Sequence, residues 1–297
     1  MNAALESRSR AFTWLACASA LAGICLYVVF IRTPIGQRWD DRAYLGSLLA
    51  NLKAQQRVTA ILHEISISTL VFMVILLLVI GLLRKRLATA ILTAIAFGGA
   101  VLSAEVLKRV LHRPDLAPDM NSLVNETNID TYPSGHATIA ISFALGLLMV
   151  SSLRARLATA ALGMLWAAWI SMAALVAGWH RPSDVAGGIA LGTCWMAGAA
   201  ALATRRHGRL GAPTGDIRWL PAAAGGALLL ALGVLTFWIS RGDPTQIPVT
   251  GGLPAFILGQ ASIGALAVCA VALFAYLLRG LSFDSTTDTH AAATAGT

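Results

Sequence analysis

The sequence contains little charge, because only 12% of its 297 residues are Asp, Glu, Lys or Arg. A soluble globular chain is about a quarter charged and about half apolar. This chain is 57% hydrophobic, and its mean hydropathy is +0.72. These values exclude an ordinary soluble domain and indicate a polytopic membrane protein.

Lysine is also scarce, since only three of the 22 basic residues are lysines, namely Lys53, Lys85 and Lys108. This bias toward arginine is common in proteins from GC-rich bacterial genomes. The net charge is +8, but the basic residues lie in short clusters between apolar segments rather than on one patch. We therefore expect no nucleic-acid partner.

Only four cysteines occur, Cys17, Cys25, Cys194 and Cys269, and each lies inside an apolar segment. None is in a loop where an oxidising compartment could pair it, which argues against a disulfide framework. Their spacing does not resemble that of a metal site either. We interpret all four as small, buried apolar residues.

Long apolar segments are what the sequence does contain. A helix needs about 20 apolar residues to cross the hydrocarbon core of a membrane. Eight segments qualify, at roughly 11–31, 65–83, 87–107, 137–153, 157–179, 184–203, 219–240 and 254–278. The sequence therefore predicts an all-α, polytopic helical bundle with about eight transmembrane helices. The first segment is too long for the apolar part of a signal peptide, so we interpret it as an uncleaved anchor.

Basic residues in the short connections predict the orientation of the bundle. In an eight-span arrangement they gather on one side, which we expect to be the cytoplasm together with both termini. They are Arg8, Arg10, Arg84, Lys85, Arg86, Arg154, Arg156, Arg205, Arg206, Arg209 and Arg279. The connections 32–64, 108–136, 180–183 and 241–253 then face outward. The expected location is the bacterial inner membrane.

The spans divide the chain into four parts. Residues 1–203 hold the first six spans, 204–218 form a cytoplasmic linker rich in Arg, Gly and Pro, and 219–281 hold two more spans. Residues 282–297 are rich in Thr, Ala and Asp, and we expect a disordered cytoplasmic tail.

The outer stretch 37–63 has amphipathic spacing. Apolar side chains recur at helical intervals between charged residues, at Leu45, Leu48, Leu49 and Leu52. This pattern predicts an amphipathic helix that lies in the membrane interface or packs on the bundle.

Two histidine motifs lie in the outer connections. The motif Pro-Ser-Gly-His ends at His136, and His180 is followed four residues later by Asp184. At the start of a helix, this spacing lets the carboxylate of Asp184 accept the Nδ1 proton of His180, which leaves Nε2 free to attack. Imidazole can also supply the acid for a leaving oxygen, a role open to His136. The combination fits a phosphohistidine mechanism at a membrane surface.

Three further residues suit the binding of a phosphoryl group. Ser134 and Gly135 precede an expected helix, where a hydroxyl and N–H groups at the positive end of the helix dipole favour anions. Lys108, at the end of the third span, adds a cation. A metal site built from the two histidines and the aspartate is possible by ligand type. No further ligand-like cluster is nearby, so we expect no metal.

These residues resemble the PAP2 (type 2 phosphatidic acid phosphatase) superfamily of integral membrane lipid phosphatases. The family signature consists of Lys-x6-Arg-Pro, Pro-Ser-Gly-His and Ser-Arg-x5-His-x3-Asp. Lys108 fits the start of the first motif, Pro133–His136 match the second, and His180 with Asp184 fit the end of the third. The resemblance covers roughly residues 10–203 and implies a six-helix core.

The resemblance also implies a role for each residue. His180 would be the nucleophile, Asp184 its orienting carboxylate and His136 the general acid. Lys108, Ser134 and Gly135 would bind the phosphoryl oxygens. The reaction would need neither a metal nor another cofactor.

Two arginines of the family signature are absent from their usual places. After six intervening residues from Lys108, where the signature has arginine, the chain has Asp115, although Arg113 lies two positions earlier. The Ser-Arg pair of the third motif would fall at 173–174, which are both alanine. We hypothesise that Arg113 and Arg181, which are close to the missing positions, take over the binding of phosphate.

The resemblance implies a phosphatase that acts on a lipid phosphomonoester or pyrophosphate at the outer face of the membrane. Polyprenyl pyrophosphates, phosphatidic acid and phosphatidylglycerol phosphate are the candidate substrates. Two alternatives are a phosphotransferase of the same superfamily and a non-catalytic protein that binds or transports lipids on the same scaffold. The sequence leaves open the lipid, the oligomeric state and the role of the last two spans.

Overall fold

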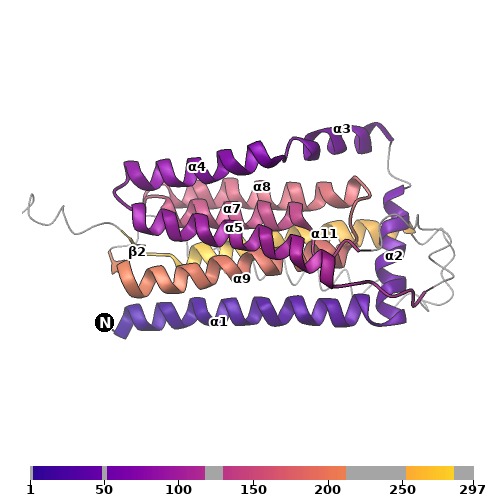
Figure 1. Ribbon diagram of the computed structural model, residues 1–297, viewed down its shortest axis with the longest axis horizontal. Helices are drawn as coiled ribbons and strands as arrows, with labels where there is room; N and C mark the ends of the chain where they lie inside the picture. The colour runs from indigo at the N-terminus through magenta and orange to yellow at the C-terminus, as the bar shows by residue number, and fades with distance from the viewer. Residues whose placement is uncertain (1–2, 49–51, 118–129, 212–251, 284–297) are drawn as a thin grey trace, which may run out of the picture.

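The computed structural model describes residues 3–48, 52–117, 130–211 and 252–283. Figure 1 shows long helices side by side and one helix laid across the end of the bundle. The first half contains α1 (Ala3–Leu26), the short π-helix η1 (Tyr27–Ile31), α2 (Pro34–Leu48), α3 (Leu52–His63), α4 (Ile67–Leu83) and α5 (Leu87–Val110). The second half contains α7 (Gly135–Val150), α8 (Arg156–Val176), α9 (Pro182–His207), β1 (Arg209–Leu210), α11 (Gly252–Leu277) and β2 (Leu281–Ser282). The predicted all-α, multi-helical class is confirmed.

Several helices are suited to crossing a membrane. In the described residues, five segments are long and apolar enough: Ala3–Ile31, α5, α8, α9 and α11. The end of α3 and the whole of α4 meet at a bend of 61° and pass the same test together, which makes six. α7 is also apolar, but its 16 residues are shorter than a full span.

Seven of the eight predicted membrane segments coincide with helices. The first helix begins earlier than expected, at Ala3, and α9 continues beyond residue 203 to His207. The predicted span at 219–240 lies outside the described residues. So do part of the predicted linker and nearly all of the predicted tail.

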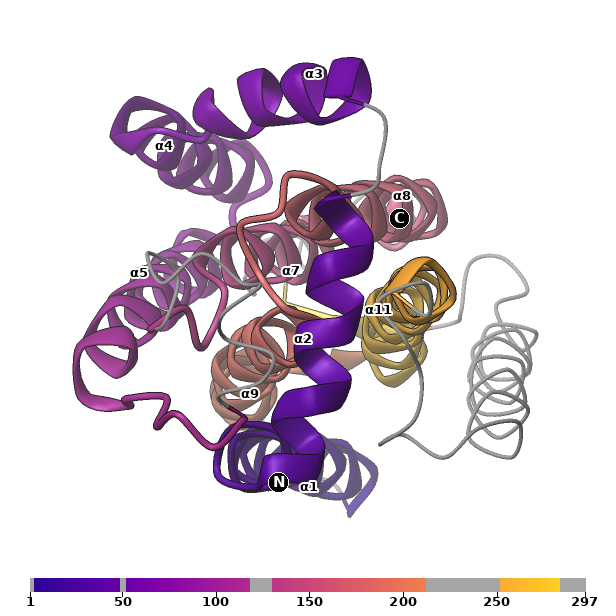
Figure 2. The same cartoon turned by 90° about the vertical axis from the view of Figure 1, so that its right-hand side faces the viewer.

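The stretch 37–63 differs from its prediction, because it forms two helices rather than one. Figure 2 shows α2 crossing the end of the bundle, where it packs against α11 and η1. The acidic residues of α2 do not face water, since Asp40 and Asp41 are only 2% and 1% exposed. The leucine spacing is therefore a poor guide to which face of α2 is buried, because charged residues of α2 are buried with partners on the bundle.

α7 occupies the centre of the bundle, where it contacts α5, α8 and α9 (Figure 2). A helix that is apolar around its whole circumference suits such a position. Glycines let α9 approach α7 closely. A Cβ added to Gly188 would lie 2.4 Å from the backbone oxygen of Ser134, and one added to Gly192 would lie 2.4 Å from Cγ2 of Ile141. The starts of α7 and α9 therefore pack with almost no space between them.

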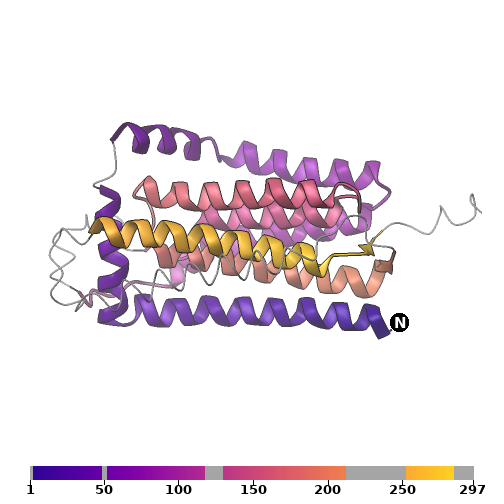
Figure 3. The same cartoon turned by 180° about the vertical axis from the view of Figure 1, so that it is seen from behind.

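The end of the bundle opposite α2 is held by arginines and a short sheet. Figure 3 shows α11 running from the end that α2 crosses to β2. β1 pairs with β2 in antiparallel fashion. Arg156 donates hydrogen bonds from Nη1 to the carbonyl oxygens of Leu278 and Leu281, at 2.6 and 2.8 Å. Arg86 donates to the carbonyl oxygen of Ser151 at 2.6 Å. Some of the basic residues at this end therefore join helices to one another.

The close approach of α9 to α7 leads to a prediction about stability. We expect Gly188→Ala to destabilise the protein by about 1–3 kcal/mol, because the new methyl group meets backbone atoms that cannot move aside. Gly198→Ala is the control on the same helix, since no atom lies within 4 Å of its added Cβ. Thermal unfolding in detergent measures both. Equal melting temperatures for the two variants would contradict the close packing.

Candidate active site

The residues singled out in the sequence meet at the end of the bundle that α2 crosses. His136 lies in the first turn of α7, and Asp184 lies in the first turn of α9. His180 lies just before α9, and Lys108 is in the last turn of α5. Figure 2 looks onto this end of the molecule. The alternating direction of the helices thus brings together residues from two separate connections, the one between α5 and α7 and the one before α9.

Asp184 is fully buried beside His180. Its Oδ2 atom lies 3.8 Å from Nδ1 of His180, which is itself only 8% exposed. This distance is too long for a hydrogen bond, although catalytic contacts often shorten when a substrate binds. The same Oδ2 accepts hydrogen bonds from the backbone N–H of Arg181 at 3.0 Å and from Oγ1 of Thr131 at 2.5 Å.

Local sequence explains why Asp184 takes this position. α9 begins with Pro182, which suits the first turn of a helix because its missing N–H would have no helical partner there. Asp184, two residues later, turns its carboxylate back to the free N–H of Arg181, as acidic residues do in a capping box. The i, i+4 spacing then brings His180 to the same carboxylate.

The second histidine faces the first across a small space. The ring centroids of His136 and His180 are 6.4 Å apart. Trp179 packs against His136 with a centroid distance of 5.3 Å, and His63 at the end of α3 also contacts Trp179, with a centroid distance of 5.0 Å. The motif spacing predicts neither Trp179 nor His63 at this place.

Ser134 and Gly135 form the start of α7. Ser134 caps the helix, since its Oγ accepts the N–H of Ala137 at 3.4 Å. Its own N–H donates to the carbonyl oxygen of Asp184 at 2.8 Å, which joins the two histidine segments directly. Gly135 leaves room for Lys108, because an added Cβ would lie 3.1 Å from the Lys108 Nζ atom.

Lys108 also forms an ion pair. Its Nζ lies 2.7 Å from Oε1 of Glu105, one turn earlier on α5. Half of the Glu105 side chain is exposed, so the pair is accessible to water. Exposed pairs of this kind are weak, so the ammonium group can exchange this partner for an anion.

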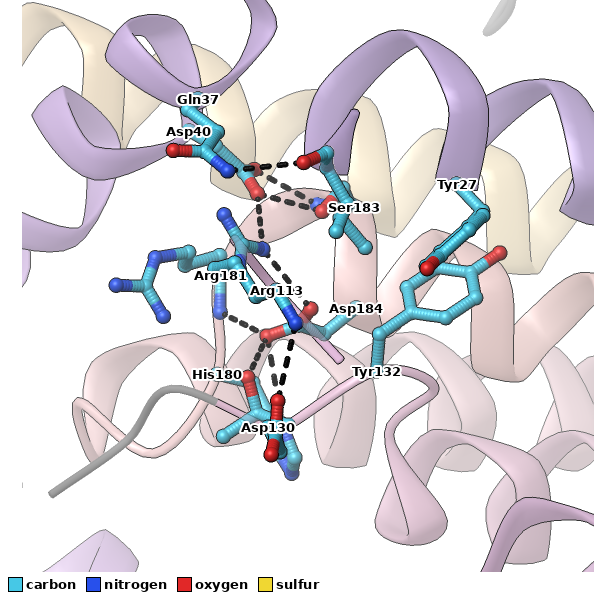
Figure 4. Close-up of polar contacts among 12 residues, drawn as sticks. Tyr27, Gln37, Asp40, Arg113, Asp130, Tyr132, His180, Arg181, Ser183 and Asp184 are labelled. Carbon is cyan, nitrogen blue, oxygen red and sulfur yellow. Dashed lines mark hydrogen bonds and ion pairs between the residues drawn. The ribbon is translucent and has the colours of Figure 1, made fainter. Parts of the chain in front are cut away.

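Arg113 lies between two buried carboxylates (Figure 4). Its Nη2 atom is 3.0 Å from Oδ2 of Asp40 and 3.4 Å from Oδ1 of Asp184. Burial alone would lower the pKa of Arg113, but the two carboxylates outweigh burial and raise it, so the guanidinium stays charged. Burial raises the pKa of Asp40, while Arg113 acts in the opposite direction.

Arg181 has a different arrangement. Its backbone N–H binds Asp184, but its side chain extends to α2, where Nε donates to Oδ1 of Asp41 at 2.5 Å. The guanidinium also lies over the ring of Tyr44, 5.2 Å from the centroid. Both arginines that were predicted to bind phosphate therefore contact acidic residues of α2 in this structure.

The loop that leads to α7 is held by further polar contacts. Oδ1 of Asp130 accepts the backbone N–H of Arg113 at 3.0 Å, and its Oδ2 lies 3.0 Å from Nδ1 of His112. Burial acts to raise the pKa of Asp130, but these two contacts outweigh burial and lower it. The hydroxyl of Tyr132 donates to the carbonyl oxygen of Gly23 on α1 at 2.6 Å. These contacts fix the approach to the histidine motif.

An apolar cavity adjoins the site on the far side of Asp40. Its volume is 310 Å³, and it lies between α1, α2, α9 and α11. Asp40 and Ser183 contribute its polar edge, while most of the lining is aliphatic or aromatic, including Phe30, Leu258 and Leu266. In the described residues, no three His, Cys, Asp or Glu side chains are grouped so that they could hold a metal ion.

The acidic residues of α2 are the main feature that the motifs did not predict. Asp40 contacts Arg113 across 73 positions of sequence, and Asp41 contacts Arg181 across 140. The sequence offers one signal for these ion pairs. Two adjacent acidic residues lie in a predicted outer helix, and two arginines lie in the other connections on the same predicted side of the membrane. Sequence spacing alone does not say which groups will pair over such distances.

The position of Arg113 leads to a prediction about stability. We expect Arg113→Leu to destabilise the protein by about 3–5 kcal/mol, because it leaves Asp40 and Asp184 buried without their shared cation. Arg109→Leu is the matched control, since Arg109 is exposed on the last turn of α5. Chemical unfolding in detergent at neutral pH measures both variants. A loss in Arg113→Leu no larger than in the control would mean that the buried pairs contribute little.

Comparison with known proteins gives one match. Residues 87–207 match the family model of the PAP2 superfamily. Neither a comparison with curated proteins nor one with solved structures finds a match. The matched stretch runs from the first residue of α5 to the last residue of α9, and it includes both histidine motifs and Lys108. It excludes α2 and therefore Asp40. The chain thus carries a PAP2 superfamily domain in residues 87–207, set in a multi-pass membrane protein.

Proposed function

We propose that this protein hydrolyses a lipid phosphomonoester or pyrophosphate through a phosphohistidine formed on His180. The PAP2 domain supports a phosphatase-type function in general. The observation that supports the detailed proposal best is the arrangement of three groups: two imidazoles with centroids 6.4 Å apart, and a buried carboxylate on the Nδ1 side of one of them. This arrangement suits a nucleophile with an orienting carboxylate, opposite a second group that can move protons.

The first step transfers the phosphoryl group to the enzyme. Nε2 of His180 attacks phosphorus, the bond from phosphorus to the leaving oxygen breaks, and His136 gives a proton to that oxygen. Asp184 holds the Nδ1 proton and stabilises the charge that develops on the imidazole. In the second step water attacks phosphorus, the N–P bond breaks, and His136 takes up the proton of the water. Phosphate leaves and both histidines return to their starting forms.

Three cations lie near the path of the phosphoryl group. Lys108 adjoins Gly135 at the start of α7, and we propose that it binds phosphoryl oxygens together with the N–H groups of this turn and Ser134. Arg113 and Arg181 are proposed to assist while they keep their carboxylate partners, and Arg113 can offer Nε and Nη1, which have no hydrogen-bond partner among the described residues. Binding by preorganised cations and N–H groups is usually the largest contribution to such reactions.

A lipid substrate fits the surroundings of the site. Two of the helices that bear the site, α5 and α9, are long and apolar enough to cross a membrane, and the cavity beside Asp40 can accommodate part of a hydrocarbon chain. The histidine end of the bundle is opposite the end with most of the basic residues of the short connections. By the positive-inside rule we propose that the site faces the periplasm or cell exterior, in a bacterial inner membrane.

The proposed mechanism makes His180 indispensable. We expect His180→Ala to lower phosphate release by at least about a thousandfold, because loss of a nucleophile removes the covalent pathway. The assay uses protein purified in detergent, with phosphatidic acid, phosphatidylglycerol phosphate and farnesyl pyrophosphate as separate substrates, each with and without EDTA. His207→Ala, at the opposite end of α9, serves as the control and should behave as the wild type.

Four results would contradict this function. Phosphate release that survives His180→Ala would exclude the phosphohistidine. Loss of activity in EDTA would indicate a metal-dependent reaction. Transfer of the phosphoryl group to an added lipid alcohol, with little free phosphate, would favour a phosphotransferase, and lipid binding without turnover would favour a binding protein.

The contact between Gly135 and Lys108 allows a test of phosphate binding that spares the fold. We expect Gly135→Ala to lower kcat/KM about tenfold or more, because the added methyl group displaces the ammonium group, and charged hydrogen bonds contribute about 1.5–3 kcal/mol. The melting temperature should fall little, since the atoms that must move are the ends of two flexible side chains, Lys108 and Glu105. Unchanged kcat/KM would show that Lys108 does not act on the substrate.

A further inference from the structure

We infer that Asp40, which lies outside the PAP2 domain, is a positioning residue for the catalytic pair His180 and Asp184. This inference rests on the proposed function. Asp40 belongs to α2, the helix that crosses the histidine end of the bundle (Figure 2). Among the described residues, Asp40 makes no contact with His136 or His180. It acts on Asp184 through two residues that contact or adjoin Asp184, namely Ser183 and Arg113.

The first route passes through the start of α9. Oδ1 of Asp40 accepts the backbone N–H of Ser183 at 3.0 Å, and Oδ2 accepts the Ser183 hydroxyl at 2.5 Å. Ser183 directly precedes Asp184 in the chain. Two hydrogen bonds to one residue restrain both its backbone and its side chain, so Asp40 fixes the position and rotation of the first turn of α9. Because Asp184 belongs to that turn, the position of its carboxylate is fixed as well.

The second route passes through Arg113. Figure 4 shows its guanidinium between the two carboxylates. The same Nη2 atom serves Asp40 at 3.0 Å and Asp184 at 3.4 Å, so the shorter contact is with Asp40. Asp40 thereby shares the guanidinium with Asp184, so that Arg113 neutralises the charge of Asp184 only in part. With less of its charge neutralised, Asp184 is a better partner for the imidazole of His180, 3.8 Å from its other oxygen.

Burial makes both routes effective. Asp40, Ser183 and Asp184 are 2%, 3% and 0% exposed, so water cannot replace a lost contact without opening the site. Electrostatic and hydrogen-bond effects are larger in such surroundings than at a surface. A small displacement of a reacting group can cost on the order of a hundredfold in rate. Asp40 therefore acts on turnover more than on the binding of substrate.

The test compares Asp40→Asn with a control on the same helix. Gln37 is also buried, and its Nε2 donates to the carbonyl oxygens of Ile31 and Pro114 at 2.8 and 2.6 Å. Its Oε1 also accepts the backbone N–H of Leu116 at 3.1 Å. Gln37→Met therefore weakens the docking of α2 onto the segment after Arg113, but it removes no contact of Ser183 and no charged side chain. We expect Asp40→Asn to lower kcat by on the order of 10- to 100-fold with KM within about threefold. Gln37→Met should lower the melting temperature at least as much, with kcat within about threefold of the wild type.

A second measurement does not depend on turnover. Nuclear magnetic resonance of protein with isotope-labelled histidine reports the ring nitrogens of each imidazole. We expect Asp40→Asn to shift the His180 nitrogen signals and to leave those of His207 unchanged, whereas Gln37→Met should shift neither. If the wild type hydrolyses no substrate, the proposed function fails, and this measurement still decides the role of Asp40.

Two outcomes would overturn the inference. The first is a kcat for Asp40→Asn no lower than that of Gln37→Met. The second is a His180 signal that Asp40→Asn leaves unchanged. Should Asp40→Asn fail to fold, Ser183→Ala replaces it, because it removes one hydrogen bond of Asp40 and keeps every charge. We then expect a smaller loss of kcat and a smaller shift of the same signal, and the absence of both would overturn the inference equally.

Discussion

Arg113 forms ion pairs with Asp40 and Asp184, and all three side chains are nearly inaccessible to water. A buried charge without a partner is strongly unfavourable, so each member of this group requires the others. The group joins α2, the connection after α5 and the start of α9 at one point. The histidine end of the bundle depends on it, because the same Asp184 that Arg113 binds also lies 3.8 Å from Nδ1 of His180. The same charged side chains therefore join the helices and surround the proposed nucleophile.

Small residues make this junction possible. The starts of α7 and α9 meet at Gly188, and the N–H of Ser134 reaches the carbonyl oxygen of Asp184. A larger side chain at this crossing would separate the helices and increase the 6.4 Å between the two imidazoles. Lys108 reaches the same region beside Gly135, where an added Cβ would lie 3.1 Å from its Nζ atom. The spacing of the charged groups thus follows from the packing of the apolar bundle.

Local patterns in the sequence were sufficient for much of this architecture. Apolar runs identified seven helices that the structure describes, and the helix-start spacing of His180 and Asp184 identified their contact. The role of α2 was not accessible in the same way. Its leucines at helical spacing indicated amphipathicity, but Asp40 pairs with a residue 73 positions away, and no short-range pattern encodes such a contact. Likewise, the side chain of Arg181 forms its ion pair with Asp41 on α2 and does not point toward its sequence neighbour His180 in a way that the motif predicts.

The order in which the chain is made gives α2 a further meaning. Asp40 is synthesised 73 residues before Arg113 and 143 residues before Ser183, its two partners. Asp40 lacks its cation until Arg113 has been made, and it lacks both hydrogen bonds to Ser183 until α9 has been made. The contacts that hold α2 over the end of the bundle are therefore complete only after α9 has been synthesised, although α2 itself comes early in the chain.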